Sequence, residues 1–432
     1  MYNSRSRSTN QTGSRPNYSG SRPSFRGQGR PSSGGGGFRR SFGGGGGRGF
    51  GGRGRGPGRV NDYVIHDYIR RASVKPAVSA YVAPVQEDVS FDSLNLPEQL
   101  KRNVVRHGYT KLTPIQIQGI PAIREGKDVI GIANTGTGKT AAFLIPLIEK
   151  IMKDRNYKAL IVAPTRELAL QIRDELRKFA DGMPIYSSFC IGKSSMYTQI
   201  RELQRNPHVV VGTPGRLKDL IDRKALKLER FSMVILDEAD QMLDMGFIND
   251  IKEIISYLPK ERQSLFFSAT LSQNINGLIK SFVTNPVTIS VKTTETTSHI
   301  KQEVIQVEAA VGKVEKLTTL LREESFSKVL VFGRTKMGVE RLSRDLFAKG
   351  FKVTSIHGDK AQFQRQQSLR MFKEDVVNIM VATDVAARGL DIPNVSHVIN
   401  FDVPQTYEDY IHRIGRTGRA DKTGTAVTFI QG

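Results

Sequence analysis

The sequence has few of the features that stabilise secreted or membrane-spanning proteins. Its 432 residues include one cysteine, Cys190, and no tryptophan. A single cysteine excludes an intramolecular disulfide and argues against a cysteine-based metal site. No apolar run approaches the roughly 18 residues of a membrane-spanning helix, and the polar N-terminus lacks the apolar segment of a secretory signal. We therefore expect a cytoplasmic protein without a membrane span.

The charge is strongly one-sided. Lys and Arg number 64 against 42 Asp and Glu, which gives a formal net charge of +22. This excess points to an anionic partner, either nucleic acid or an anionic membrane surface. Hydrophobic residues make up only 38% and glycines number 41, so part of the chain is expected not to fold. At roughly 100–200 residues per domain, the length suggests two domains, or one domain with long tails.

The first 60 residues differ in composition from the rest. They hold 12 Arg, no Lys, no acidic residue and 19 of the 41 Gly. Such a segment cannot bury enough apolar surface to fold, so we predict a disordered Arg/Gly-rich tail over residues 1–60. Its Arg-Gly pairs and six scattered aromatics suit contacts with single-stranded nucleic acid, and the alternative is a solubilising tail. Residues 61–88 are transitional, with Val64–Ile69 forming a helix or a strand.

The remainder alternates strand-like and helix-like segments, which predicts α/β domains with parallel sheets covered on both faces. The helix patterns include residues 141–153 and 166–179. The predicted strands are residues 129–132, 159–162, 209–211, 233–236, 328–332, 353–356, 379–382, 397–400 and 426–430. A polar stretch without periodicity begins at Lys292, so we place an interdomain linker at 293–300. The domains are then 89–292 and 301–432.

A glycine-rich loop connects the first of these strands to an apolar helix, which is the context of a phosphate-binding P-loop. Gly136 and Gly138 let backbone N–H groups turn towards phosphates, aided by the helix N-terminus. Lys139 can bridge the β- and γ-phosphates, and the Thr140 hydroxyl can ligate Mg²⁺. The predicted nucleotide site comprises Ala133, Asn134, Thr135, Gly136, Thr137, Gly138, Lys139 and Thr140. The alternative is a plain glycine-rich turn.

An acidic pair, Asp237 and Glu238, directly follows a second apolar strand. A carboxylate at the end of a buried parallel strand lies near the P-loop, at the carboxyl edge of the sheet. We predict that Asp237 holds Mg²⁺ through water and that Glu238 orients and deprotonates the attacking water. The alternative is a solvated acidic loop.

The second domain lacks a Gly-Lys-Thr sequence but contains an arginine cluster. Arg413, Arg416 and Arg419 recur every third residue and fall on one side of a helix or tight turn. We interpret Arg413 and Arg416 as arginine fingers that reach a γ-phosphate held by the first domain. The alternative is a basic patch. One P-loop and one arginine cluster favour an ATP site that is complete only when the two domains close.

Together these motifs resemble the DEAD-box family of ATP-dependent RNA helicases, in helicase superfamily 2, over about residues 89–432. Asp237–Asp240 is similar to the family's namesake tetrapeptide. The resemblance implies two tandem RecA-like parallel-sheet domains, with ATP and Mg²⁺ as cofactors. Phe91 and Gln116 resemble the family's Q motif, in which an aromatic ring stacks on adenine and a glutamine reads its edge. Asp391 is implied to accept hydrogen bonds from the ribose.

The resemblance also implies residues for RNA contact and for coupling. The implied RNA contacts are Thr165, Arg166, Gly192, Thr213, Arg216, Arg334, Gln362, Arg365 and Thr383. The implied coupling and domain-linking residues are Asp240, Ser268, Thr270, His412 and Arg419. The sequence departs from the family at Lys193, where a second glycine is usual, and we expect a lysine contact to RNA there. The usual helix after the last strand is also missing, so we expect slightly poorer cover of the second domain.

The implied function is ATP hydrolysis upon domain closure around RNA, with local separation of short duplexes or remodelling of RNA–protein complexes. Recognition of backbone and 2′-hydroxyl groups would make it largely independent of base sequence. Two other classes remain open, namely a DNA-directed superfamily 2 helicase and a non-hydrolysing RNA clamp or scaffold. We expect a monomer whose main partner is RNA.

Overall fold

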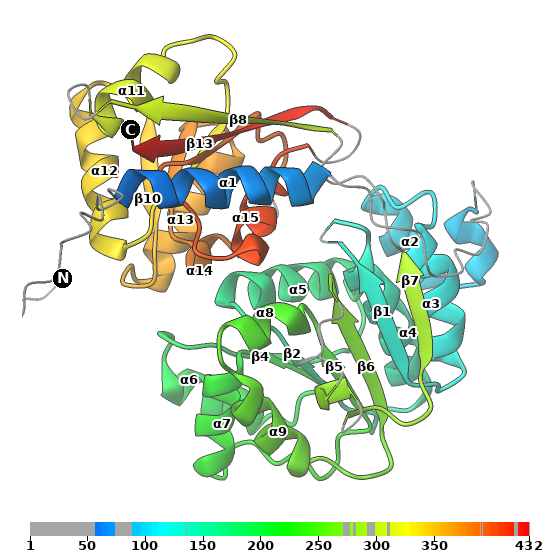
Figure 1. Ribbon diagram of the computed structural model, residues 1–432. Coiled ribbons are helices and arrows are strands. Elements are labelled where there is room, and N and C mark those ends of the chain that lie inside the picture. The colour runs from blue at the N-terminus through cyan, green and yellow to red at the C-terminus, as the bar shows by residue number, and fades with distance from the viewer. Residues whose placement is uncertain are drawn as a thin grey trace, which may run out of the picture. The chain divides into compact units, whose positions relative to one another are not determined.

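The computed structural model of the protein describes residues 57–73, 89–134, 136–270, 277–279, 282–291, 299–308, 312–388, 390, 392–418 and 422–431. The predicted tail up to residue 56 and most of the predicted linker lie outside these residues. The described part contains two parallel sheets with their helices and one N-terminal helix (Figure 1). None of its helices is long and apolar enough to cross a membrane.

The first sheet is parallel throughout, with the strand order β3-β4-β2-β5-β6-β1-β7. Its strands are β1 (Val129–Ala133), β2 (Ala159–Val162), β3 (Ser187–Cys190), β4 (Val209–Gly212), β5 (Met233–Leu236), β6 (Gln263–Ser268) and β7 (Val287–Val291). Alternate residues along the central strands belong to two separate apolar cores. For example, Ile161 and Ile235 face one core, whereas Leu160 and Val234 face the other, because side chains alternate along a strand.

Helices cover both faces of this sheet. On one face lie η1 (Phe91–Leu94), α2 (Glu98–Arg106), α3 (Pro114–Arg124), α4 (Lys139–Lys153) and α5 (Arg166–Phe179). On the other lie α6 (Met196–Leu203), α7 (Pro214–Asp222), α8 (Ala239–Asp244) and α9 (Ile248–Ser256). This burial from both sides explains why the predicted strands read as continuous apolar runs.

The second sheet is also parallel throughout, in the order β10-β11-β9-β12-β13-β8. Its strands are β8 (Ile300–Val307), β9 (Val329–Phe332), β10 (Val353–Ile356), β11 (Ile379–Ala382), β12 (His397–Asn400) and β13 (Gly424–Gln431). Its helices are α11 (Lys313–Leu320), α12 (Lys336–Ala348), α13 (Gln362–Lys373), α14 (Asp384–Ala387) and α15 (Tyr407–Ile414). The predicted α/β class with two parallel sheets is confirmed.

The transitional segment forms a helix, α1 (Pro57–Ser73), rather than a strand. It begins inside the predicted tail, so the boundary at residue 60 is wrong and the helix starts at residue 57. Proline is favoured at the first position of a helix because its missing N–H has no partner there anyway. Ile65, Tyr68 and Ala72 form a buried stripe at helical spacing, and this stripe packs on the second sheet and on α15.

Candidate ATP site and RNA-binding surface

The order of the strands brings three predicted motifs to one half of the first sheet's carboxyl edge. The P-loop follows β1, the acidic tetrapeptide follows β5, and Ser268 ends β6. In the sheet, β6 lies between β5 and β1. Because all three strands are parallel, their carboxyl ends meet at the same edge.

The P-loop has the backbone geometry that its glycines predict. Gly136 and Gly138 both have φ of +90°, a conformation that residues with a side chain rarely adopt. A Cβ atom at Gly138 would lie 2.4 Å from Nε2 of Gln116, so a side chain there would displace Gln116 from its present position. The Lys139 ammonium is buried and donates to the carbonyl of Ala133 at 2.6 Å. Its charge therefore points into the loop, where a phosphate would bind.

Asn134 and Thr137 belong to the same turn, since the Thr137 hydroxyl donates to the Asn134 carbonyl at 2.8 Å. Thr140 occupies the second position of α4, one residue beyond Lys139. Thr135 lies outside the described residues.

The predicted adenine-binding residues contact the protein itself. Nε2 of Gln116 donates to the Gly138 carbonyl at 3.0 Å, while its Oε1 accepts from the Thr113 backbone at 2.9 Å and caps α3. Gln116 therefore connects the Q motif to the P-loop. The ring of Phe91 is buried edge-on against Tyr109, with centroids 5.7 Å apart. Recognition of adenine by these two residues stays a prediction, and Asp391 lies outside the described residues.

Asp237 and Glu238 are both buried beside the P-loop. Burial raises the pKa of Asp237, whereas the Lys139 ammonium acts to lower it. Glu238 adopts a left-handed backbone conformation with φ of +53°, which is uncommon for a residue other than glycine. Its N–H donates to Oδ1 of Asp237 at 3.0 Å. A strained backbone and a carboxylate with a perturbed pKa beside a phosphate loop are typical of catalytic sites.

The last residue of the tetrapeptide, Asp240, binds the turn that follows β6. Its Oδ2 accepts from the backbone N–H groups of Ala269 at 2.9 Å and Thr270 at 3.1 Å, and from the Thr270 hydroxyl at 3.4 Å. The Ser268 hydroxyl donates to the Thr270 carbonyl at 2.7 Å. The three predicted coupling residues Asp240, Ser268 and Thr270 therefore form one hydrogen-bonded unit.

The structure separates the two predicted arginine fingers. Arg413 is buried and donates to both carboxylate oxygens of Asp384, at 2.5 and 2.8 Å, and to the Asp402 carbonyl at 2.6 Å. These bonds hold it within the second domain, so this geometry gives no support to Arg413 as a finger. Arg416 donates to the backbone carbonyl of Leu390 at 2.7 Å and stays the candidate.

His412 and Arg419 are the other two residues predicted to link the domains. Burial lowers the pKa of His412, and the Asp240 carboxylate of the first domain acts in the opposite direction. A domain-linking role for His412 stays a prediction. Arg419 lies outside the described residues.

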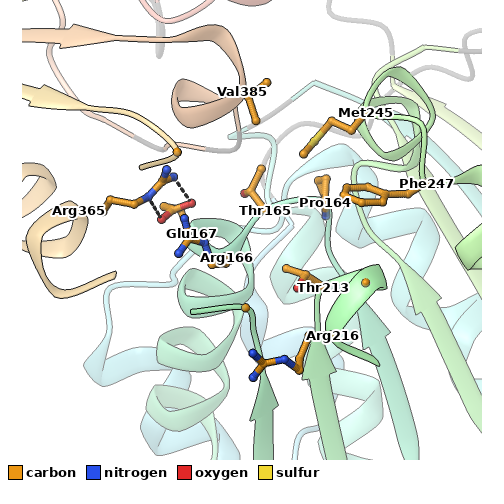
Figure 2. Close-up of a pocket in the computed structure, with 13 residues that line it drawn as sticks. Pro164, Thr165, Arg166, Glu167, Thr213, Arg216, Met245, Phe247, Arg365 and Val385 are labelled. Carbon is orange, nitrogen blue, oxygen red and sulfur yellow. Dashed lines mark hydrogen bonds and ion pairs between the residues drawn. The ribbon is translucent and has the colours of Figure 1, made fainter. Parts of the chain in front are cut away.

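The other half of the first sheet's carboxyl edge carries predicted RNA contacts. Gly192, Thr213 and Thr165 lie in the loops after β3, β4 and β2, which are neighbours in the sheet. With Arg166 and Arg216 they line a cavity of about 400 Å³ (Figure 2). The remaining lining residues are Pro164, Glu167, Gly215, Met245, Phe247, Gly358, Arg365 and Val385.

Some of these polar groups already have partners. The Thr165 hydroxyl accepts from the Leu168 N–H at 3.2 Å and caps α5, and Arg216 donates to the Ser194 carbonyl at 3.2 Å. In the second domain, Arg334 is exposed and Thr383 lies at the N-terminus of α14.

Gln362 and Arg365, which were predicted as RNA contacts, both bind Glu167 in this structure. Arg365 approaches the Glu167 carboxylate at 2.6 and 2.8 Å, and both side chains are only 4% exposed (Figure 2). Gln362 donates to the same carboxylate at 3.2 Å. A buried carboxylate that already holds a bidentate arginine leaves little of that arginine for a phosphate. Glu167 was not among the predicted site residues. Its one indication in the sequence is that it directly follows two predicted RNA contacts.

Lys193, for which we expected a contact with RNA, contacts another part of the protein. Its φ of +58° is the left-handed conformation that the family's usual glycine would adopt readily. Its ammonium donates to the carbonyl of Gly358 in the second domain. The lysine therefore keeps the glycine-like turn and adds a contact between residues of the two domains.

A P-loop, an acidic tetrapeptide and a separate arginine cluster on two parallel sheets define the class of two-domain helicases. Two family models match the chain, "DEAD/DEAH box helicase" over residues 113–278 and "Helicase conserved C-terminal domain" over residues 312–421. The chain belongs to the DEAD-box family of ATP-dependent RNA helicases in superfamily 2.

Individual relatives agree with this assignment. The DEAD-box ATP-dependent RNA helicase CshA of Bacillus licheniformis is 49% identical over 349 residues, which cover 79% of this chain and 70% of the relative. CshA of Geobacillus kaustophilus is 48% identical over 348 residues, covering 79% and 73%. The solved structure of S. cerevisiae Dbp5 bound to RNA and ADP BeF3 matches with a TM-score of 0.72 at 32% identity, covering 79% of this chain and 90% of that one.

Proposed function

We propose that the protein couples ATP hydrolysis to closure around one RNA strand, which separates short duplexes locally or remodels RNA–protein complexes. The observation that carries the proposal is the division of one sheet edge into two halves. The loops after β5, β6 and β1 hold the nucleotide motifs, and the loops after β3, β4 and β2 line the cavity with predicted RNA contacts. Residues of the second domain would also contact both ligands, since Gly358, Arg365 and Val385 line the cavity and Arg416 is the candidate for the γ-phosphate, so each ligand would favour the closed state.

The residues beside the P-loop fit a magnesium-bound nucleotide. The Thr140 hydroxyl and the Asp237 carboxylate are hard oxygen donors, which Mg²⁺ prefers. Gly136 and Gly138 add no side chain to the turn, so their backbone N–H groups would be open to a phosphate. When bound, Mg²⁺ would neutralise charge that develops on the phosphates. Lys139 would hold the β- and γ-phosphates in place of its present carbonyl partner.

Glu238 is the candidate for the group that accepts a proton from the attacking water. Glu238 is buried directly after Asp237, and its N–H donates to Oδ1 of Asp237 at 3.0 Å, which holds Glu238 next to the predicted Mg²⁺ ligand. Arg416 would stabilise the γ-phosphate from the second domain, and Gln116 would read adenine once it leaves Gly138. A single chain holds all these groups, which supports a monomer as the active form.

Three parallel reactions test the proposal. ATP turnover is measured with single-stranded RNA, with DNA of the same sequence, and with neither, alongside separation of a short RNA duplex. We expect RNA to stimulate turnover and DNA not to do so. Equal stimulation by DNA would favour a DNA-directed helicase, and RNA binding without any hydrolysis would favour a clamp. Light scattering of the RNA-bound protein tests the monomer.

A further inference from the structure

Helix α1 packs against the short helix that leads to the arginine cluster. Its buried stripe of Ile65, Tyr68 and Ala72 shares one apolar core with α15, β8 and β13, and α1 lies alongside β13 and α15 in Figure 1. The buried partners in this core are Ile300, Val403, Tyr410, Ile414, Ala426 and Ile430. A helix from the N-terminal side of the first domain is therefore part of the second domain's core.

Tyr68 makes the most specific contacts of this helix. Its hydroxyl donates to the Gln405 carbonyl at 3.2 Å, just before α15 begins. Its ring lies 5.8 Å from that of Tyr407 and 5.9 Å from that of Tyr410, both on α15. One turn further along α1, the Arg71 guanidinium lies 4.1 Å from the centre of the Tyr407 ring. The start of α15 is therefore held from the α1 side by a hydrogen bond, two ring contacts and a cation–π contact.

The other end of α15 leads directly to the arginine cluster. Ile414, the last residue of the helix, belongs to the core shared with α1 and stands two residues before Arg416. Arg416 itself donates to the Leu390 carbonyl at 2.7 Å. Because α15 has only eight residues, it is too short to be stable alone, and its position depends on what it packs against.

We propose that α1 braces α15 and thereby sets the position of Arg416, with Tyr68 as a positioning residue for ATP hydrolysis. The inference rests on the proposed function, since it requires that Arg416 acts on the γ-phosphate. Tyr68 would touch neither ATP nor RNA. Its effect would be on turnover rather than on ATP binding, because an arginine finger contributes mainly in the transition state.

The test compares three variants of the full chain. Tyr68→Ala removes the ring contacts, Tyr68→Phe removes only the bond to Gln405, and Tyr63→Ala removes a tyrosine of the same helix that is 72% exposed. We expect Tyr68→Ala to lower RNA-saturated kcat by about tenfold or more, because a displacement of about 1 Å can cost about 100-fold. KM for ATP should change little. Tyr68→Phe should keep most of the activity and Tyr63→Ala all of it.

A double variant distinguishes positioning from general destabilisation. If Tyr68 acts through Arg416, then Tyr68→Ala should have no further effect on kcat in an Arg416→Ala background. Multiplicative losses in the double variant would overturn the inference, as would a kcat of Tyr68→Ala within twofold of wild type. If the wild type hydrolyses no ATP, or if Arg416→Ala alone has full activity, it is the proposed function that fails.

Arg71→Ala keeps the test decisive if Tyr68→Ala does not fold. It leaves the buried stripe intact and removes the guanidinium above Tyr407, together with a long surface ion pair to Asp67 at 3.9 Å. We expect kcat to fall about two- to fivefold, the equivalent of one exposed cation–π contact, and the loss to disappear in the Arg416→Ala background. An unchanged kcat in a variant with wild-type circular dichroism would contradict the brace.

Discussion

Asp240 allows a sharp test of how the nucleotide half of the site is held together. Both of its carboxylate oxygens accept backbone hydrogen bonds, Oδ1 from Gln241 at 3.0 Å and Oδ2 from Ala269 and Thr270 at 2.9 and 3.1 Å. Asparagine has the same shape but only one acceptor oxygen. In Asp240→Asn the amide group must therefore face either the Gln241 N–H or the turn after β6.

The expected cost follows from these bonds. One partly buried N–H without a partner costs about 1–3 kcal/mol, and the surviving bonds lose the charge assistance that makes them roughly twice as strong as neutral ones. When these two effects are added, Asp240→Asn should lower the free energy of unfolding by about 2–4 kcal/mol. Because the bonds between the Ser268–Thr270 turn and the tetrapeptide are weakened or lost, duplex separation should fall more than ATP turnover does.

Urea denaturation and paired assays of turnover and duplex separation measure both effects. Asp222→Asn is a matched control, because Asp222 is exposed and contacts Lys218 at 3.3 Å in a surface pair worth about 0–1 kcal/mol. The reasoning is refuted if the two variants unfold at the same urea concentration and keep the wild-type ratio of separation to turnover.

The remaining predictions concern the other motifs. Glu238→Gln should abolish hydrolysis but keep ATP and RNA binding, giving a long-lived RNA complex, and near-normal turnover would remove Glu238 as the base. Arg416→Ala should lower RNA-saturated ATP turnover by about 10³-fold. A loss of less than about tenfold would mean that Arg416 is only part of a basic surface. Gln116→Ala should lower the ratio of ATP to GTP turnover, and it should also loosen the P-loop because its bond to Gly138 is lost. Deleting residues 1–56 should weaken RNA binding at low salt more than it slows RNA-saturated ATP turnover, and it should make the affinity for RNA less dependent on salt. Identical salt slopes with and without these residues would indicate a solubilising tail.

The elements that the sequence predicted well are those whose pattern is local. The central strands of both sheets are continuous apolar runs because helices bury them from both faces, and α5 spans the residues predicted for it. β6 and β8 are among the strands that were not predicted. Gln263 and Ser264 are buried in β6 although they are polar, and β8 is half-exposed at the edge of its sheet. Neither strand has the continuous apolar signal of a central strand.

The chemistry of the nucleotide site was likewise determined by the sequence. A P-loop needs glycine, lysine and threonine within eight residues after a strand, so the spacing alone specifies where phosphate would bind. The tetrapeptide is equally local, and its place beside the P-loop follows from the rule that parallel strands end at one edge.

Only the tertiary structure decided which partners meet across the chain. Arg365 and Glu167 are 198 residues apart, and nothing in either segment indicates that they form a buried ion pair. Arg413 and Arg416 look equivalent in the sequence, and nothing in it indicates that Arg413 forms a bidentate contact with Asp384. The sequence left residues 64–69 open between a helix and a strand, and it did not indicate that α1 would pack on α15. Such pairings depend on how strands are ordered and helices packed, which local residue patterns do not encode.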